Sequence, residues 1–200
     1  VTHGRRLVQV GFMRRFDPGY VGMKRALDGG ELGAALLFHC IHRNSVGSPN
    51  LKSENLIVGS AVHEFDICRW LLGDEVKRVT VVKPRRTGAT DAQDPQLILL
   101  EMASGVVVDI EVFVNATYGY DVRGELVCET GTVSLAPPTE TLLRHGRKEG
   151  IALPHDWRPR FAEAYALELQ AWIASIGSGV PAGASAFDGY VATAIADAGV

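Results

Sequence analysis

Polar and titratable side chains that could take part in acid–base chemistry occur in four groups along this sequence. A neutral histidine beside a carboxylate, supported by an asparagine and by arginines, suits the binding and deprotonation of a polyhydroxylated molecule. We expect these groups at strand ends and helix starts, where clefts form in domains built from a sheet and helices. The four groups are Arg14 with Arg15, His42 with Asn44, His63 with Asp66, and Tyr118 with Tyr120.

The central group lies in the segment from Gly59 to Gly73, GSAVHEFDICRWLLG, which predicts a helix. Ser60 can cap its start, and Gly73 suits the left-handed residue that follows a helix. His63 would then lie near the positive end of the helix dipole, which disfavours imidazolium and keeps the ring neutral. The same pattern also fits a buried histidine that is satisfied by a structural Asp66.

The other groups also allow structural interpretations. His42, His63 and Asp66 could form a metal site with two histidines and one carboxylate, although nothing in their spacing requires it. The paired arginines could be solvated charges at a strand end, and the two tyrosines could pack against another subunit. From the residues alone, the sequence predicts a substrate-binding domain whose catalytic role stays open.

The composition is typical of a soluble globular protein. Of the 200 residues, 46% are hydrophobic and 22% are charged. The formal net charge of −3 gives no reason to expect nucleic acid or an anionic membrane as a partner. No apolar run reaches the roughly 18 residues of a transmembrane helix. Cys40, Cys68 and Cys128 lie in hydrophobic runs and predict buried free thiols in a cytoplasmic protein.

Two strands and one helix are predicted before the central helix. The first strand covers residues 6–15, the helix residues 17–29, and the second strand residues 34–44. Asp17 and Pro18 suit the N-cap and the first position of the helix, and a glycine pair ends it at Gly29. Strand alternation puts His42 and Asn44 on the same face of the second strand.

After Gly73 the apolar residues alternate with a period of two, which predicts strands. These strands cover residues 76–83, 96–102, 106–114, 120–129, 132–135 and 141–144. The Ser-Gly pair at 104–105 and the Thr-Gly pair at 130–131 are hairpin turns, so the strands that they connect should be antiparallel. A long helix is predicted over residues 157–176, and a second one begins after Ser185.

These elements predict an α+β fold, an open, mainly antiparallel sheet with helices packed on one face. No repeat or linker divides the chain, so we expect residues 1–200 to form a single domain. The helix-free face of the sheet must be polar or covered. We expect a homo-oligomer that buries apolar residues of this face between subunits, namely Val112, Val114, Leu126 and Cys128.

Several nucleotide-binding and catalytic motifs are absent from the sequence. No G-x-G-x-x-G follows a predicted strand, since the nearest match, at residues 177–182, follows a helix and contains Pro181. The sequence also lacks a Walker loop and a G-x-S-x-G nucleophile elbow. This chain by itself therefore predicts no phosphate-cradling loop.

Five segments, in order over nearly all 200 residues, carry a resemblance to a known family. They are VQVGFMRRFDPGY, HCIHRN, VHEFDICRWLLGDE, DPQLILLEMASGVVVDIEVFVNATYGYDV and DWRPRFAEAYALELQAW. Together they resemble the second domain of inositol 2-dehydrogenases, which belong to the glucose–fructose oxidoreductase/inositol dehydrogenase (Gfo/Idh/MocA) family. The resemblance implies a longer protein whose N-terminal Rossmann domain, absent from this chain, holds NAD or NADP and a catalytic lysine.

The resemblance also implies roles for individual side chains. His63 resembles the family's catalytic histidine, and Asp66 is the second residue expected to be catalytic. Contacts with the substrate are expected from Arg14, His42, Asn44, Gly59 and Tyr120. Contacts with the cofactor are expected from Arg15, Tyr118 and Tyr165. The antiparallel sheet resembles the family's usual oligomer surface.

One position departs from the family's pattern. Inositol dehydrogenases typically carry an aspartate four residues before the catalytic histidine, and here that position is Gly59. The departure implies that the substrate differs from myo-inositol, that Asp66 or Glu54 compensates, or that activity is lost.

From the resemblance we expect the full-length protein to oxidise a secondary hydroxyl of a cyclitol or sugar to a ketone, with hydride passing to NAD(P). His63 would take the hydroxyl proton, and the 200-residue chain alone would be inactive. The expected partner is a small polyol or sugar, and no metal is expected. The alternative is a non-catalytic carbohydrate-binding or assembly module of the same fold.

Overall fold

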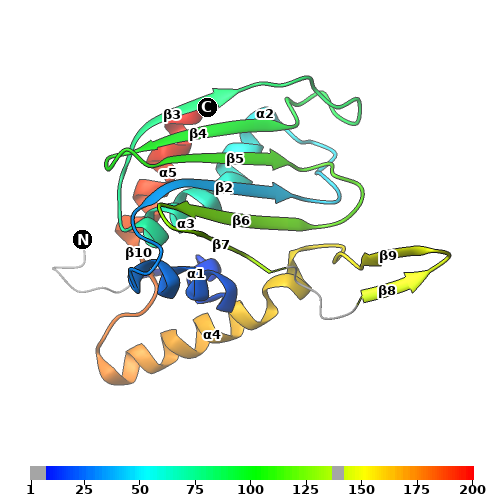
Figure 1. Cartoon of the computed structure of the whole chain (residues 1–200). Helices are drawn as coiled ribbons and strands as arrows, with labels where there is room; N and C mark the ends of the chain where they lie inside the picture. Colours follow the sequence, from blue (N-terminus) through cyan, green and yellow to red (C-terminus); the bar gives the residue numbers. More distant parts are fainter. Residues whose placement is uncertain (1–7, 137–141) are drawn as a thin grey trace.

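A six-stranded mixed sheet forms the centre of the computed structural model, which describes residues 8–136 and 142–200. Its strand order is β3-β4-β5-β2-β6-β7 (Figure 1). The strands are β2 (Ala35–Arg43), β3 (Val76–Val82), β4 (Gln96–Met102), β5 (Val107–Phe113), β6 (Asp121–Cys128) and β7 (Thr132–Ser134). β2 and β5 run parallel, and the other neighbouring pairs of this sheet are antiparallel. The predicted α+β fold is confirmed.

Helices cover one face of this sheet, and a long helix runs below it (Figure 1). The helices are η1 (Met13–Phe16, a 3-10 helix), α1 (Pro18–Asp28), α2 (Ser53–Asn55), η2 (Leu56–Ala61, a π-helix), α3 (Val62–Leu72), α4 (Trp157–Ser178) and α5 (Ala186–Gly199). η2, α3 and α5 pack on strands of the sheet, and α4 packs on η1. Within residues 8–136 and 142–200, no helix has both the length and the apolar character that crossing a membrane requires.

Alternation along the strands places the core between sheet and helices. Phe38, Ile98 and Ile110, from three different strands, are fully buried in this core. The residues expected between subunits, Val112, Val114, Leu126 and Cys128, are at most 5% exposed within this one chain. That expectation was wrong, because their side chains belong to the face that the helices already cover. The outward face carries the alternate residues of each strand, among them the half-buried Leu99 of β4.

The central helix begins earlier than predicted. α2, η2 and α3 follow one another without a break from Ser53 to Leu72, so Ser60 lies inside the helical segment and does not cap it. The side chain of Asn55 accepts a hydrogen bond from the backbone N–H of Lys52 at 2.8 Å, which stabilises the true start. The predicted end is confirmed, since Gly73 has a left-handed φ of 62°.

The first predicted strand is mostly replaced by a turn. Only β1 (Gln9–Val10) is extended, paired with β10 (Ala184–Ser185), and η1 follows at Met13. Residues 6 and 7 lie outside the described residues. The turn lets the two successive arginines of η1 reach carboxylates on α3, which a straight strand would not allow. The start of α1 is confirmed, because the Asp17 side chain accepts from the backbone N–H of Tyr20.

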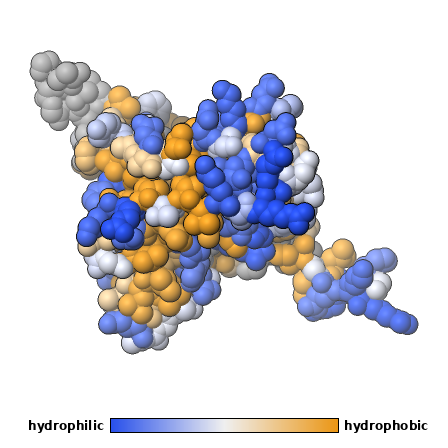
Figure 2. All heavy atoms as spheres, turned by 90° about the horizontal axis from the view of Figure 1, so that it is seen from above, coloured by the Kyte–Doolittle hydropathy of each residue, from blue (hydrophilic) through white to orange (hydrophobic). Residues whose placement is uncertain are grey.

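A hairpin formed by β8 (Leu142–His145) and β9 (Lys148–Ile151) projects from the body (Figure 1). The prediction of a strand near residues 141–144 holds for β8, although Thr141 lies outside the described residues, and β9 was not predicted. Figure 2 shows the hairpin reaching away with a hydrophilic tip, whereas hydrophobic residues form a connected area over the body.

Leu126 provides a test of which face of the sheet forms the core. We expect Leu126→Ala to lower the free energy of unfolding by about 2–5 kcal/mol, because the cavity left behind cannot fully collapse. Leu99→Ala, on the half-buried outward face, should cost clearly less. Urea denaturation at two widely separated protein concentrations measures both. A loss seen only at the higher concentration would instead place Leu126 in a subunit interface.

Candidate functional site

A cavity of about 290 Å³ lies where the end of β2, the start of β6, η1, η2, α3 and α4 meet. It is lined by Met13, His42, Asn44, Gly59, Ser60, His63, Tyr120, Trp157 and Tyr165. Strand alternation turns His42 to the helix-covered face of β2, and the helical repeat aligns Gly59 with His63 one turn later. Six of the predicted site residues, from separate stretches of the chain, therefore share one cavity.

A buried ion network lies beside this cavity. The guanidinium of Arg14 donates to the carboxylate of Glu64, and its Nη2 lies 3.3 Å from Nδ1 of His42. The same Nδ1 lies 3.0 Å from Oε2 of Glu64. Arg14, Glu64 and His42 are 1%, 0% and 4% exposed, so water contributes almost nothing to their solvation. The network joins η1, α3 and β2 through charge and not through apolar packing alone.

Glu64 is the residue of this network that the sequence analysis missed. Burial alone would raise the pKa of its carboxyl, but Arg14 and His42 outweigh burial and lower that pKa to about 2. A signal was present, because Glu64 lies three residues after Ala61 and four before Cys68, on the apolar stripe of the helix. A carboxylate inside such a stripe indicates a buried ion pair.

The network sets the proton arrangement of His42. Nδ1 of His42 faces Oε2 of Glu64 at 3.0 Å and Nη2 of Arg14 at 3.3 Å. The carboxylate only accepts and the guanidinium only donates, so the shorter contact favours the tautomer with its proton on Nδ1. In the neutral ring, Nε2 is then a hydrogen-bond acceptor. His42 can therefore accept a hydrogen bond from a hydroxyl group in the cavity.

His63 is held neutral by its surroundings. Burial and, next, the charge of Arg14 lower the pKa of its imidazole to about 4. Its Nδ1 is buried and has no hydrogen-bond partner among the described residues. The predicted neutral state thus has a different cause from the one expected, because the helical segment starts at Ser53 and His63 is not at its positive end. A neutral imidazole in this position can accept a proton.

Asp66 and Arg15 lie outside the cavity lining. Arg15 donates to Asp66 through Nε at 2.9 Å and through Nη2 at 2.5 Å, and it also pairs with Asp188 of α5 at 3.1 Å. Asp66 is 1% exposed, and burial raises the pKa of its carboxyl despite the arginine. The arrangement ties η1 to α3 and α5, which is the structural role that the sequence analysis left open for Asp66.

Two further predicted residues also lie outside the lining. Arg14 is buried beside the cavity and does not line it. The hydroxyl of Tyr118 accepts from Arg43 at 2.8 Å and donates to Asp121 at 2.6 Å, and its side chain is half-exposed. Asp66 and Glu54, the two residues suggested to compensate for Gly59, do not line the cavity either. Asp66 pairs with Arg15, and Glu54 is exposed.

Glu168 is a second buried carboxyl close to the site. It is 5% exposed on the face of α4 that also carries Tyr165, and its Oε1 has no hydrogen-bond partner in the described part of the chain. Burial, with a smaller contribution from Asp66, raises the pKa of Glu168 to about 7. The side chain is therefore largely protonated in mildly acidic solution.

The arrangement suits acid–base chemistry on a neutral polar molecule. The cavity offers two imidazoles, one amide and three hydroxyls, and none of its lining residues is acidic. Among residues 8–136 and 142–200, no cluster of three or more His, Cys, Asp or Glu side chains could hold a metal ion. In particular, the set of His42, His63 and Asp66 does not converge, because Asp66 pairs with Arg15.

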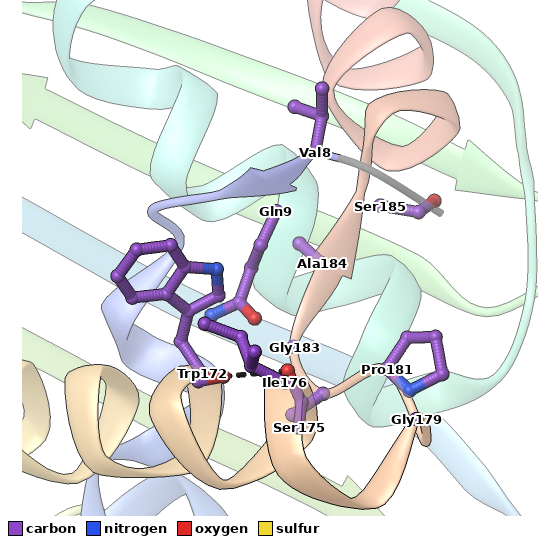
Figure 3. Close-up of a pocket in the computed structure, with 11 residues that line it drawn as sticks. Val8, Gln9, Trp172, Ser175, Ile176, Gly179, Pro181, Gly183, Ala184 and Ser185 are labelled. Atoms are coloured by element: carbon purple, nitrogen blue, oxygen red, sulfur yellow. Dashed lines mark hydrogen bonds between the residues drawn. The ribbon is translucent and has the colours of Figure 1, made fainter. Parts of the chain in front are cut away.

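A larger hollow of about 370 Å³ lies between α4 and the paired strands β1 and β10 (Figure 3). Figure 3 shows Gln9 directed towards it from β1, and Trp172 and Ile176 from α4. Its lining consists of Val8, Gln9, Trp172, Ser175, Ile176, Gly179, Pro181, Ala182, Gly183, Ala184 and Ser185. None of these side chains titrates near neutral pH, so this hollow is no candidate for acid–base catalysis.

Comparisons with known proteins agree with the fold and with the resemblance. A family model described as the GFO/IDH/MocA C-terminal domain matches residues 20–134. The chain is 56% identical over 200 residues to inositol 2-dehydrogenase 1 of Saccharopolyspora erythraea, covering 99% of this chain and 59% of the relative. It is 45% identical to an inositol 2-dehydrogenase of Burkholderia vietnamiensis, with the same coverage of both chains.

A solved structure shows the same fold. The structure of myo-inositol dehydrogenase from Lactobacillus casei, in complex with NAD(H) and myo-inositol, matches with a TM-score of 0.94 and 35% identity. The match covers 98% of this chain and 59% of that one. The chain thus spans 59% of the length of each of these three proteins.

Replacing Glu64 by glutamine leaves Arg14 without a buried counter-charge, so the free energy of unfolding at neutral pH should fall by about 3–5 kcal/mol. The folded-state pKa of Glu64, about 2, lies below the ordinary 4.5. Its contribution is therefore complete above pH 4.5 and is lost as the pH falls towards 2. The difference between wild type and Glu64→Gln should shrink on acidification, as measured by denaturant unfolding. The isosteric control is Glu163→Gln, on the exposed face of α4. A difference that stays constant with pH would contradict this interpretation.

Glu168 should show the opposite pH dependence. Its folded-state pKa of about 7 lies above the ordinary 4.5, so the folded state binds more protons between these values. The stabilisation that it contributes is present below pH 4.5 and is lost as the pH rises through 7. Glu168→Gln cannot ionise and should lose less stability than wild type on the way to alkaline pH, whereas Glu163→Gln should follow wild type. Identical pH profiles for Glu168→Gln and wild type would show that the carboxyl ionises freely in the folded protein.

Proposed function

Because this chain belongs to the GFO/IDH/MocA family, we propose that residues 1–200 form the substrate-binding domain of a longer NAD-dependent dehydrogenase. Its substrate is inositol or a related cyclic polyol, and a secondary hydroxyl is oxidised to a ketone. The observation that carries the proposal is the neutral, buried His63 in a cavity lined by polar, uncharged groups. The relatives named as inositol 2-dehydrogenases, and the related structure with NAD(H) and myo-inositol, support it.

The cavity's own groups would bind the ring of the polyol. The free Nε2 of His42 accepts a hydrogen bond, Asn44 both donates and accepts, and the hydroxyls of Ser60 and Tyr120 do the same. A polyol loses its hydrogen bonds to water on entry, so each hydroxyl needs such a partner. Groups of this kind reject analogues that lack a hydroxyl.

His63 would act on the reacting hydroxyl as the general base. Its imidazole is neutral at physiological pH, because its pKa is lowered to about 4, and so it can take the O–H proton as the C–O bond becomes a carbonyl. When bound, NAD supplies the acceptor for the hydride that leaves the same carbon. The Arg14–Glu64 pair would keep His42 correctly oriented and acts as a positioning network.

The cofactor would be held mainly by the part of the polypeptide outside this chain. The sequence has no phosphate-cradling glycine loop after a strand, and the cavity of about 290 Å³ is of a size for a small polyol. Of the three residues predicted to contact the cofactor, Tyr165 lies in the cavity lining and is the one that we propose for this contact. The 200-residue domain alone is therefore proposed to be inactive.

We also propose a homo-oligomer that forms through the outward face of the sheet. This face combines half-buried apolar residues such as Leu99 with ion pairs, among them Arg43 with Glu111 at 2.6 Å. Mixed surfaces of this kind are common in subunit interfaces. The three buried free cysteines support a reducing compartment, and we propose the cytoplasm. With a net charge of −3, neither nucleic acid nor membrane is proposed as a partner.

The test is oxidation of myo-inositol by the full-length protein, followed as formation of NADH. We expect activity in the full-length protein and none in the isolated domain. His63→Ala should lower kcat by about 10²- to 10⁴-fold, the usual effect of removing a general base. His145→Ala, in the exposed strand β8, is the control and should leave the rate unchanged.

Three results would contradict the proposal in different ways. An inactive full-length protein that still binds the polyol would favour the carbohydrate-binding module. Full activity of His63→Ala would assign the base to another group. Saturable activity of the isolated domain would show that this chain holds the cofactor itself.

A further inference from the structure

Gly59 is a glycine that the fold itself does not require. It lies inside η2, and its φ is not among the positive values that favour glycine. A Cβ placed there would meet no heavy atom of residues 8–136 and 142–200 within 4 Å, so the fold leaves room for a side chain to begin at this position. Glycine inside a helix costs about 0.5–1 kcal/mol relative to alanine. Neither backbone conformation nor packing therefore explains why this position has no side chain.

The position of Gly59 points to a role in binding. Gly59 lines the cavity, four residues before His63, and positions with this spacing lie roughly 5–6 Å apart on one helix face. η2 is a π-helix, an element found frequently at functional sites. The open space thus lies beside the proposed general base.

The chemistry of the surrounding groups limits what the space can accept. The cavity lining contains no Asp, Glu, Lys or Arg, and the nearby Arg14 is buried and already paired with Glu64. A charged substituent would therefore find no counter-charge among these groups. A neutral substituent needs none.

We propose that the space at Gly59 is a subsite for a neutral, carbon-bearing substituent on the ring of the substrate. Either the hydroxymethyl group of a pyranose or the methoxy group of an O-methylated cyclitol has this chemistry. The inference rests on the proposed function, since it needs the ring to be held with its reacting hydroxyl at His63. It adds that Gly59 determines selectivity between substituted and unsubstituted rings.

The experiment uses the full-length protein and three substrates: myo-inositol, D-glucose and a mono-O-methyl inositol. Wild type should oxidise at least one substituted ring with a kcat/KM no lower than that for myo-inositol, and the second and third substrates tell the two sources apart. Gly59→Leu fills the space and should lower kcat/KM for the substituted ring by about 10- to 200-fold relative to myo-inositol. Gly59→Asp should also favour myo-inositol, because its carboxylate can accept a hydrogen bond from a ring hydroxyl.

Gly22→Leu is the matched control. Gly22 is an exposed helical glycine of α1, outside the cavity, and a Cβ there also meets no atom of the described residues within 4 Å. Both leucine variants should gain helix stability, measured as a rise in Tm, but only Gly59→Leu should change the ratio of kcat/KM values. This comparison separates a binding effect from a general effect of replacing a helical glycine.

Three outcomes would overturn the inference. If wild type prefers myo-inositol and Gly59→Leu leaves the ratio unchanged, Gly59 is not a subsite, although the proposed function stands. If Gly59→Leu lowers kcat/KM equally for all substrates, the space is filled by another part of the polypeptide. If wild type oxidises none of the three, the proposed function fails and the inference fails with it.

Discussion

The buried pairing of Arg14 with Glu64 is the interaction on which the site depends. Both groups are withdrawn from water, and a charge in that position is tolerated only with a hydrogen-bonded partner of opposite sign. The pair therefore constrains η1, which carries Arg14, to lie against α3, which carries Glu64. His42 completes the arrangement from β2, so a turn, a helix and a strand far apart in the sequence are held in one geometry. The proposed catalytic cavity lies directly beside this junction.

The same charges also determine which protons the site carries. Glu64 favours the tautomer of His42 that carries its proton on Nδ1, and in that tautomer the other ring nitrogen is an acceptor. Arg14 contributes to lowering the pKa of His63, which keeps that ring neutral. One structural network therefore supplies two imidazoles with different surroundings. One is oriented by a carboxylate, and the other has a buried nitrogen without a hydrogen-bond partner in the described part of the chain. This division suits a reaction in which one group binds a hydroxyl while the other removes a proton.

The packing of α4 against η1 forms the wall of the site opposite the sheet. Arg160 of α4 pairs with Asp17 at 2.6 Å, and Phe161 lies 5.7 Å from the guanidinium of Arg14. These contacts position the first half of α4, which contributes Trp157 and Tyr165 to the cavity. The second half exposes the apolar residues Leu169, Trp172, Ile173 and Ile176. Apolar area of this extent on one helix is typical of a surface that another part of a protein covers.

Local patterns in the sequence were sufficient for the elements and the fold class. The alternation of apolar residues predicted the strands from β2 to β8, and it also predicted which side of β2 carries His42. Asp17 and Gly73 marked one helix start and one helix end. These features were predictable because they depend on residues that are neighbours in the chain. The sequence also singled out six of the cavity-lining residues. It could not predict that Asp66 pairs with Arg15 outside the cavity, that Glu64 is the carboxylate beside it, or that Leu126 faces the helices. Those outcomes depend on which charges and which sheet face become buried, and burial is decided only when distant segments pack together.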